Sequence, residues 1–139
     1  MVVITKFLEF HTKGENDIKN ITEDVRNALN ETNLENGIIL VFAVGATGAI
    51  TTIEYENGLL NDFGDALARI APKDIDYEHG KRWNDDNGRS HVKASLLKPD
   101  LTVPFKDKNL ILGTWQQIVF VELDTKARER KIVVQIMGE

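Results

Sequence analysis

Residues 37–44 constrain the fold most, because this segment is apolar on both faces of an extended chain. It reads Gly-Ile-Ile-Leu-Val-Phe-Ala-Val and carries no charge. A strand with one face in water alternates apolar and polar residues, whereas a strand covered on both faces is apolar throughout. The segment therefore predicts the central strand of a sheet that is covered on both sides. A chain of 139 residues can build that arrangement as one domain.

Strand and helix patterns flank this segment on both sides. Apolar residues alternate with period two in the strand patterns, and they recur at three- and four-residue steps in the helix patterns. Polar side chains at the start of each helix pattern can cap it. The predicted strands are residues 2–10 and 49–54, and the predicted helices are residues 18–29, capped by Asn16 or Asp17, and residues 59–70, capped by Asn57.

The second half of the chain is a long polar loop, a short helix and several strands. Residues 74–90 contain few core-forming residues, and loops of this length are often functional. A short helix over residues 90–97 follows. The C-terminal strands are predicted at residues 101–105, 110–112, 115–123 and 131–137, the last two as a hairpin across residues 124–130.

These patterns predict one α+β domain over residues 1–139. The domain has roughly six or seven strands and about three helices.

Composition removes several classes of function. The absence of cysteine excludes thiol nucleophiles, cysteine-ligated zinc and redox pairs. A net charge of −5 argues against a nucleic-acid binder, which needs a concentrated basic face. No apolar run approaches the roughly 18 residues of a membrane span, and the first residues lack the pattern of a signal peptide. We therefore expect a cytoplasmic protein with no membrane or nucleic-acid partner.

Two of the three histidines flank the long polar loop. His79 and His91 lie on either side of Asp85 and Asp86, so a loop that folds back would bring both imidazoles to one metal ion. The spacing is not a diagnostic ligand pattern, and two surface histidines are the alternative interpretation. His11 follows the first predicted strand without an obvious partner and is expected at the surface.

Three further segments carry polar groups that could serve a site. Glu54 ends a strand, where it can be a metal ligand, a general base or a first-turn helix acid. The segment Gly45-Ala46-Thr47-Gly48, with Thr51 nearby, could offer backbone N–H groups and hydroxyls to an anion. The alternative is a glycine-permitted bulge in the sheet.

An aromatic residue and two amides enter a C-terminal strand together. Trp115, Gln116 and Gln117 could line a pocket, or they could be a core tryptophan with cross-strand amides. The charged residues 126–131 are expected in a solvated turn.

Several segments, in their order and approximate spacing, resemble one known family. They are Tyr77-Glu78-His79, Asn87, Ser90-His91-Val92-Lys93-Ala94-Ser95-Leu96-Leu97, Leu101-Thr102-Val103-Pro104, Leu112-Gly113-Thr114-Trp115-Gln116-Gln117-Ile118 and the closing stretch from Arg130 to Gly138. The chain resembles the YjbQ-like family, also described as secondary thiamine-phosphate synthase enzymes, over essentially its whole length. The resemblance implies an α+β fold in which a mixed, largely antiparallel β-sheet packs with about three helices. It also implies a homotrimer, a zinc site near the subunit interface (magnesium is the second choice) and a weak thiamine-phosphate-forming activity.

The resemblance also assigns residues to a site. His79 and His91 match family histidines, Glu54 and Thr51 match a Thr-x-Asn-Glu segment, Asp62 matches a downstream acid, and Arg130 matches an arginine near the last strand. One departure stands out. Many members carry a histidine in a His-Thr-Ser/Thr-Ala motif, and that position is Gly45 here, while the asparagine before the glutamate is Ile53.

Three hypotheses about function follow. The first is a metal-dependent transferase that joins a pyrimidine to a thiazole phosphate and releases pyrophosphate. The second is a metal-assisted hydrolase of a small phosphorylated metabolite, and the third is a non-catalytic trimer that binds a metal or anion. In the first hypothesis the metal ligands and catalytic groups are His79, His91 and Glu54, and the ligand-binding residues are Thr47, Thr51, Trp115, Gln117 and Arg130.

Overall fold

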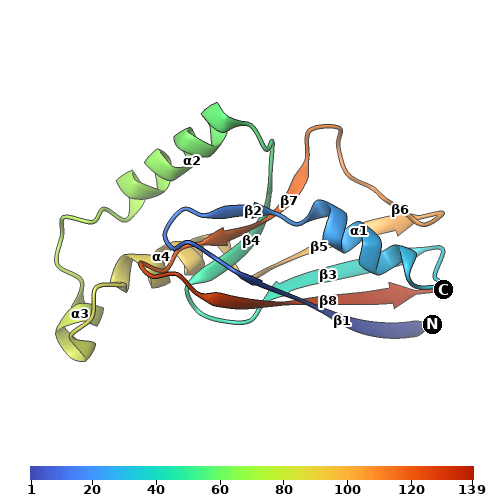
Figure 1. Ribbon diagram of the computed structural model, residues 1–139, viewed down its shortest axis with the longest axis horizontal. Coiled ribbons are helices and arrows are strands. Elements are labelled where there is room, and N and C mark those ends of the chain that lie inside the picture. The colour runs from blue at the N-terminus through green and yellow to red at the C-terminus, as the bar shows by residue number, and fades with distance from the viewer.

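The computed structural model describes residues 1–139 as eight strands and four helices (Figure 1). The strands are β1 (Val2–His11), β2 (Ile18–Asn20), β3 (Gly37–Ala43), β4 (Gly48–Ile53), β5 (Asp100–Lys106), β6 (Asn109–Leu110), β7 (Gln117–Glu122) and β8 (Glu129–Gly138). The helices are α1 (Thr22–Asn30), α2 (Asn57–Ile70), α3 (Glu78–Trp83) and α4 (Gly88–Leu97). The predicted α+β class and antiparallel pairing are confirmed.

Two antiparallel sheets form the frame of the molecule. The five-stranded sheet has the order β1-β8-β3-β5-β6, and the three-stranded sheet has the order β2-β7-β4. In the larger sheet β1 pairs with β8 along their whole lengths, from Val2 opposite Gly138 to His11 opposite Glu129. The two chain ends therefore lie side by side at one end of that sheet (Figure 1).

Two apolar clusters hold three layers together. The larger cluster joins the inner face of the five-stranded sheet to α1 and to one face of the smaller sheet, with Phe120, Ile118 and Ile50 at the contact. The second cluster joins the other face of the smaller sheet to α2 and α4 through Leu67 and Ala94. The smaller sheet is thus the middle layer, and it positions α4 against β4.

The outer face of the five-stranded sheet is bare. Ile38 and Phe42 on β3 are 43% and 37% exposed, and Phe7 on β1 is 53% exposed. The prediction of a central strand is confirmed because β3 lies third in the five-strand order. The prediction that the strand is covered on both faces is wrong for a single chain, since no element of this chain packs on the Ile38 side.

The C-terminal hairpin prediction is wrong. β7 belongs to the smaller sheet and β8 to the larger one, so residues 124–130 cross between sheets instead of turning a hairpin. A local pattern of alternation cannot distinguish these cases, because both strands have a buried face against the same core.

The predicted helix and loop boundaries also need correction. Residues 18–20 form β2, which pairs with β7, and α1 begins only after Ile21. Glu56, not Asn57, caps α2 by accepting hydrogen bonds from the N–H groups of Gly58 and Leu59. The loop predicted for residues 74–90 contains α3 and the start of α4. None of the four helices is long and apolar enough to cross a membrane.

Candidate functional site

His79 and His91 lie against each other, as the folded-back loop predicts. His79 is on α3 and His91 on α4, and their ring centroids are 4.6 Å apart with an angle of 39° between the ring planes. A short connection that begins at Asn84, the left-handed cap of α3 with a φ of 52°, lets α4 pack beside α3. Gly88 allows close packing here, since a Cβ at that position would meet the Tyr77 side chain at 2.6 Å.

Asp85 orients one of these imidazoles. Its Oδ1 lies 2.9 Å from Nδ1 of His79, which leaves Nε2 of that ring free. A histidine that binds zinc ordinarily donates its second ring N–H to a carboxylate, a backbone carbonyl or water, and Asp85 is such a partner. Two buried oxygens at the start of α4, Asn87 Oδ1 and Ser90 Oγ, have no hydrogen-bond partner. Buried polar groups are normally satisfied, so this end of α4 has capacity for a further polar group.

The donor set fits zinc only in part within one chain. Two imidazoles and an orienting carboxylate match zinc chemistry, but catalytic zinc sites ordinarily use three protein ligands. No group of three or more His, Asp or Glu side chains converges in this chain. Glu54, the expected third ligand, therefore does not join His79 and His91 within one subunit.

A partly buried ion cluster fixes α4, and with it His91. Arg89 donates from Nε and Nη2 to Glu15 at 2.8 and 3.0 Å, and Lys93 donates to the same carboxylate at 3.3 Å. The hydrogen bond from Arg89 holds the pKa of Glu15 below its usual value; burial opposes this and the charge of Lys93 adds to it. The pKa of Arg89 is correspondingly raised by Glu15.

The Glu15 cluster should make stability depend on pH. A carboxylate whose pKa is lower in the folded state contributes stability above its unfolded pKa, and this contribution is lost as the pH falls. We expect Glu15→Gln to destabilise the protein by about 1–3 kcal/mol at pH 7, because Arg89 loses its charged partner. The difference from wild type should shrink below about pH 4.3, the ordinary glutamate pKa. Urea unfolding across pH measures it.

The matched control for that experiment is Glu23→Gln. Glu23 forms an exposed pair with Arg26 one turn away on α1, and such pairs contribute little. A constant difference between Glu15→Gln and wild type from pH 7 to pH 3 would contradict the assigned role of the carboxylate.

A second group of predicted residues lines a separate hollow of about 630 Å³. Glu54, Trp115 and Gln117 all face it, together with Tyr55 and Glu56. Trp115 is 72% exposed, so the interpretation as a core tryptophan is wrong. The N–H groups of Leu59 and then Gly58 lower the pKa of Glu56, which is therefore committed to capping α2. Glu54 makes no side-chain hydrogen bond and stays available.

A third group is a buried ionic network beneath the loop between β3 and β4. Glu122 is fully buried and pairs with Arg130, whose Nε lies 2.9 Å from the carboxylate. Nη2 of Arg130 also donates to Glu122 and, at 2.9 Å, to the hydroxyl of Thr47. Thr12 donates to Glu122 at 2.6 Å from the end of β1. The expectation of a solvated turn is therefore wrong for Arg130.

Asp124 extends this network toward the surface. It accepts hydrogen bonds from Thr47 at 3.1 Å and from Nε of Arg128 at 2.8 Å. Burial acts to raise the pKa of Asp124, but the hydrogen bonds from Thr47 and Arg128 outweigh it, and the pKa lies below its usual value. Two acids and two arginines thus make the network neutral.

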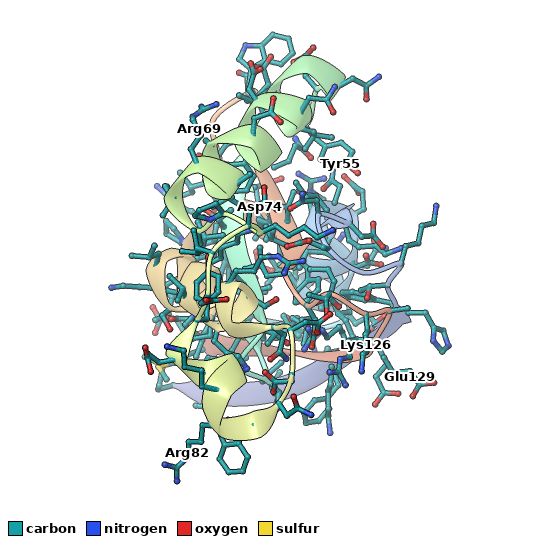
Figure 2. All side chains as sticks on the ribbon, turned by 90° about the vertical axis from the view of Figure 1, so that its left-hand side faces the viewer. Tyr55, Arg69, Asp74, Arg82, Lys126 and Glu129 are labelled. Carbon is teal, nitrogen blue, oxygen red and sulfur yellow. The ribbon has the colours of Figure 1, made fainter.

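One chain keeps the Glu54 group apart from the other two groups. Those two are neighbours, because Thr125, which follows Asp124, donates a hydrogen bond to Asp86 at 3.1 Å. Thr47 and Glu54 stand at opposite ends of β4, and seven residues of extended chain span roughly 23 Å. Figure 2 places Arg82 of α3 at one end of the molecule and Tyr55, which follows Glu54, well away from it. Thr51, in the middle of β4, faces another hollow that it shares with Gln116.

No sequence pattern identified several residues of these groups. Glu122 stands in the apolar run Ile118–Leu123, where a lone charge on a buried strand signals a buried ion pair. Glu15 lies 74 residues before Arg89 and 78 before Lys93, so no local pattern connects the acid to its two partners.

Known proteins match this chain over nearly its whole length. A family described as UPF0047 protein YjbQ-like matches residues 6–139. The chain belongs to this family. A UPF0047 protein of Methanothermobacter thermautotrophicus is 37% identical over 139 residues, which cover 100% of this chain and 95% of the relative. A UPF0047 protein of Archaeoglobus fulgidus is 32% identical, over 94% of this chain and 98% of the relative.

Solved structures of YjbQ proteins share the fold. A crystal structure described as a YbjQ-like protein of unknown function from Sulfolobus solfataricus superposes with a TM-score of 0.89 at 30% identity, covering 99% of this chain and all of that one. A YjbQ/UPF0047 protein of Clostridium acetobutylicum gives a TM-score of 0.81 at 33% identity, over 94% and 99% of the two chains. The predicted family resemblance is thus confirmed over the full chain.

Proposed function

We propose that this YjbQ protein binds a divalent metal, zinc before magnesium, at His79 and His91 and forms thiamine phosphate weakly. The observation that carries the metal site is the pair of imidazoles 4.6 Å apart, one of them oriented by Asp85. The choice of reaction comes from the resemblance to the thiamine-phosphate-forming family. The substrate class is a small phosphorylated metabolite.

The proposed reaction exchanges one bond for another. The bond between the pyrimidine methylene carbon and a pyrophosphate oxygen breaks, the thiazole nitrogen bonds to that carbon, and pyrophosphate leaves with the electron pair. A bound divalent metal would neutralise the charge that develops on the leaving pyrophosphate. Asp85 holds the tautomer of His79, and the exposed ring of Trp115 offers a surface on which an aromatic substrate can stack.

Glu54 would serve the same substrate from the other side. Its carboxylate faces the hollow beside Trp115 and has no hydrogen-bond partner of its own. It can accept a hydrogen bond from an amino group on the stacked ring. In one chain it is remote from His79 and His91, so this role needs a second subunit.

We also propose a closed trimer as the working form. In a ring of three copies each interface joins two different patches, and this chain has two apolar patches without cover. The first is the bare sheet face with Phe7, Ile38 and Phe42, and the second is the outer face of α4 with Val92 and Leu96. The α4 patch directly follows His91 in sequence, so packing it against a neighbour's sheet would bring that neighbour to the metal site.

Removing the two histidines is expected to abolish zinc binding. Purified wild-type protein should take up zinc in elemental analysis after dialysis, and His79→Ala/His91→Ala should take up none. Asp85→Asn should weaken zinc binding by about 10- to 100-fold, as loss of an orienting partner does. His11→Ala is the matched control, because His11 is 81% exposed and pairs only with Glu129 at 3.6 Å.

Activity is measured on the same variants. Wild type with zinc should form thiamine phosphate from the pyrimidine pyrophosphate and thiazole phosphate, and the double variant should not. Equal zinc content in wild type and the double variant would contradict the proposed metal site. Zinc uptake without product would support the metal site and contradict the proposed transferase activity.

A further inference from the structure

One edge of the Arg130 guanidinium is hydrogen-bonded within the chain, and the other edge has no partner. Its Nε and Nη2 donate to Glu122 and Thr47, while Nη1 makes no hydrogen bond in the chain. The side chain is only 8% exposed, and its ion pair with the fully buried Glu122 fixes its position. Nη1 therefore presents N–H donors from a rigid, largely desolvated guanidinium.

Gly45 is what leaves Nη1 open. A Cβ at this position would lie 3.0 Å from Nη1, and the φ of +143° disfavours any residue with a side chain. Gly45 and Ala46 are exposed, so the turn between β3 and β4 reaches solvent at this point. The backbone N–H groups of Gly45, Ala46 and Thr47 donate no hydrogen bond within the chain. Three unpaired backbone donors thus lie in the turn that adjoins a fixed guanidinium edge.

We propose that Arg130 Nη1 and the Gly45–Thr47 turn bind the phosphate group of a small metabolite. Phosphate oxygens accept hydrogen bonds from guanidinium and backbone N–H donors, and charge-assisted bonds of this kind are strong. The inference rests on the proposed function only for its choice of a phosphorylated ligand. In this chain the glycine at the family's histidine position thus replaces a side chain with an opening for an oxyanion.

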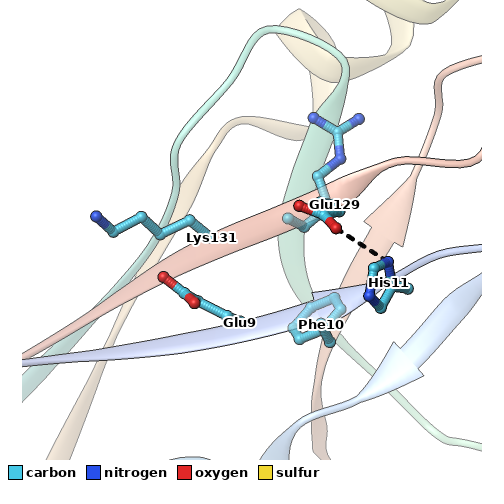
Figure 3. Close-up of a pocket in the computed structure, with 6 residues that line it drawn as sticks. Glu9, Phe10, His11, Glu129 and Lys131 are labelled. Atoms are coloured by element: carbon cyan, nitrogen blue, oxygen red, sulfur yellow. Dashed lines mark ion pairs between the residues drawn. The ribbon is translucent and has the colours of Figure 1, made fainter.

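Charge in the surroundings sets how the ligand is recognised. Glu122 balances Arg130, and Asp124 balances Arg128, so the network has no net charge. A neighbouring hollow of about 350 Å³, which Arg130 also lines, holds two acids and two basic side chains (Figure 3). These are Glu9, Glu129, His11 and Lys131, with His11 paired to Glu129. Recognition must therefore come from directed hydrogen bonds more than from long-range attraction.

Phosphate titration of the zinc-free, full-length protein tests the site. Inorganic phosphate and a simple phosphate monoester are added in separate arms, against chloride at equal ionic strength to remove screening effects. We expect the backbone amide signals of Gly45, Ala46 and Thr47 to shift together in nitrogen-correlated NMR spectra. The amide signal of Gly113 should not shift, because this N–H already donates to Gln116 at 3.0 Å. Shifts confined to residues around Lys131 and His11, or no saturable shift, would overturn the inference.

A glycine variant gives the second arm. Gly45→Ala should weaken phosphate binding by at least about tenfold, since it crowds Nη1 and strains the turn. Gly113→Ala is the matched control: its Cβ would meet Gln116 only at ordinary distances of 3.6 Å or more, and its binding should equal wild type. Unchanged binding in Gly45→Ala would overturn the site. If that variant does not fold, the titration of the wild-type protein alone tests the phosphate site. Because no zinc is present in that titration, its result does not depend on the proposed metal site at His79 and His91.

Discussion

Arg130→Met is expected to destabilise the protein by about 3–5 kcal/mol, because it leaves Glu122 charged and buried without its ion partner. Glu122 is fully buried, and after the change only Thr12 and the N–H of Asp124 still donate to its side chain. The guanidinium also lies 5.6 Å from the centre of the Phe120 ring at the core, a contact that methionine replaces only in part. Urea unfolding followed by circular dichroism measures the change.

Two controls separate the buried charge from loss of packing. Arg26→Met removes the arginine of an exposed pair with Glu23 and should cost less than about 1 kcal/mol. The double variant Glu122→Gln/Arg130→Met removes both charges and should recover a large part of the lost stability, since a buried pair replaced as a whole is often close to neutral. Equal losses in the single and double variants would show that packing, not the isolated carboxylate, sets the effect.

Most strands and helices of this fold could be predicted because each has a local pattern. The alternation in residues 2–10 and the spacing of Leu60, Phe63 and Leu67 report directly which face meets the core. The way strands combine could not be predicted in the same manner. β7 and β8 have buried faces in the same core, and only the crossover between sheets decides that β7 pairs with β2 and β4.

The apolar segment of β3 is covered on fewer faces in one chain than its composition predicts. Its composition predicted cover on both faces, and the chain covers only one. A sequence records what a residue meets in the assembled protein, while a single chain contains only part of that environment. The exposed Ile38 and Phe42 are therefore consistent with a partner surface that the chain does not supply.

The candidate site likewise contains some contacts that the local sequence predicts and others that depend on how distant strands pair. The meeting of His79 and His91 could be predicted because one loop connects them, and Asp85 lies within that loop. The grouping of Glu54 with Trp115 depends on β4 lying beside β7, which joins residues far apart in sequence. The pairing of Arg130 with Glu122 likewise needs the crossover between the sheets, whereas the run of charges alone predicts a solvated turn.

Charged substitutions on either apolar patch are expected to break the proposed trimer. Phe42→Asp places a charge on the bare sheet, and Leu96→Asp places one on the outer face of α4, which is 59% exposed at Leu96. A buried, unpaired carboxylate in an interface costs several kcal/mol, enough to shift assembly to monomers at micromolar concentration. Light scattering after size-exclusion chromatography measures the mass. Glu35→Asp, which changes neither the charge nor either patch, is the control and should stay trimeric.

Mixing the two variants distinguishes a ring from other assemblies. In a ring each interface joins the sheet of one copy to α4 of the next. The Phe42→Asp variant therefore has an intact α4 patch, and the Leu96→Asp variant has an intact sheet patch. Together they can form one intact interface, and the mixture should contain dimers that neither variant forms alone. A sheet-to-sheet dimer would instead be broken by Phe42→Asp and untouched by Leu96→Asp. If the metal site is completed at these interfaces, each monomeric variant should also lose the zinc affinity of wild type while keeping His79 and His91.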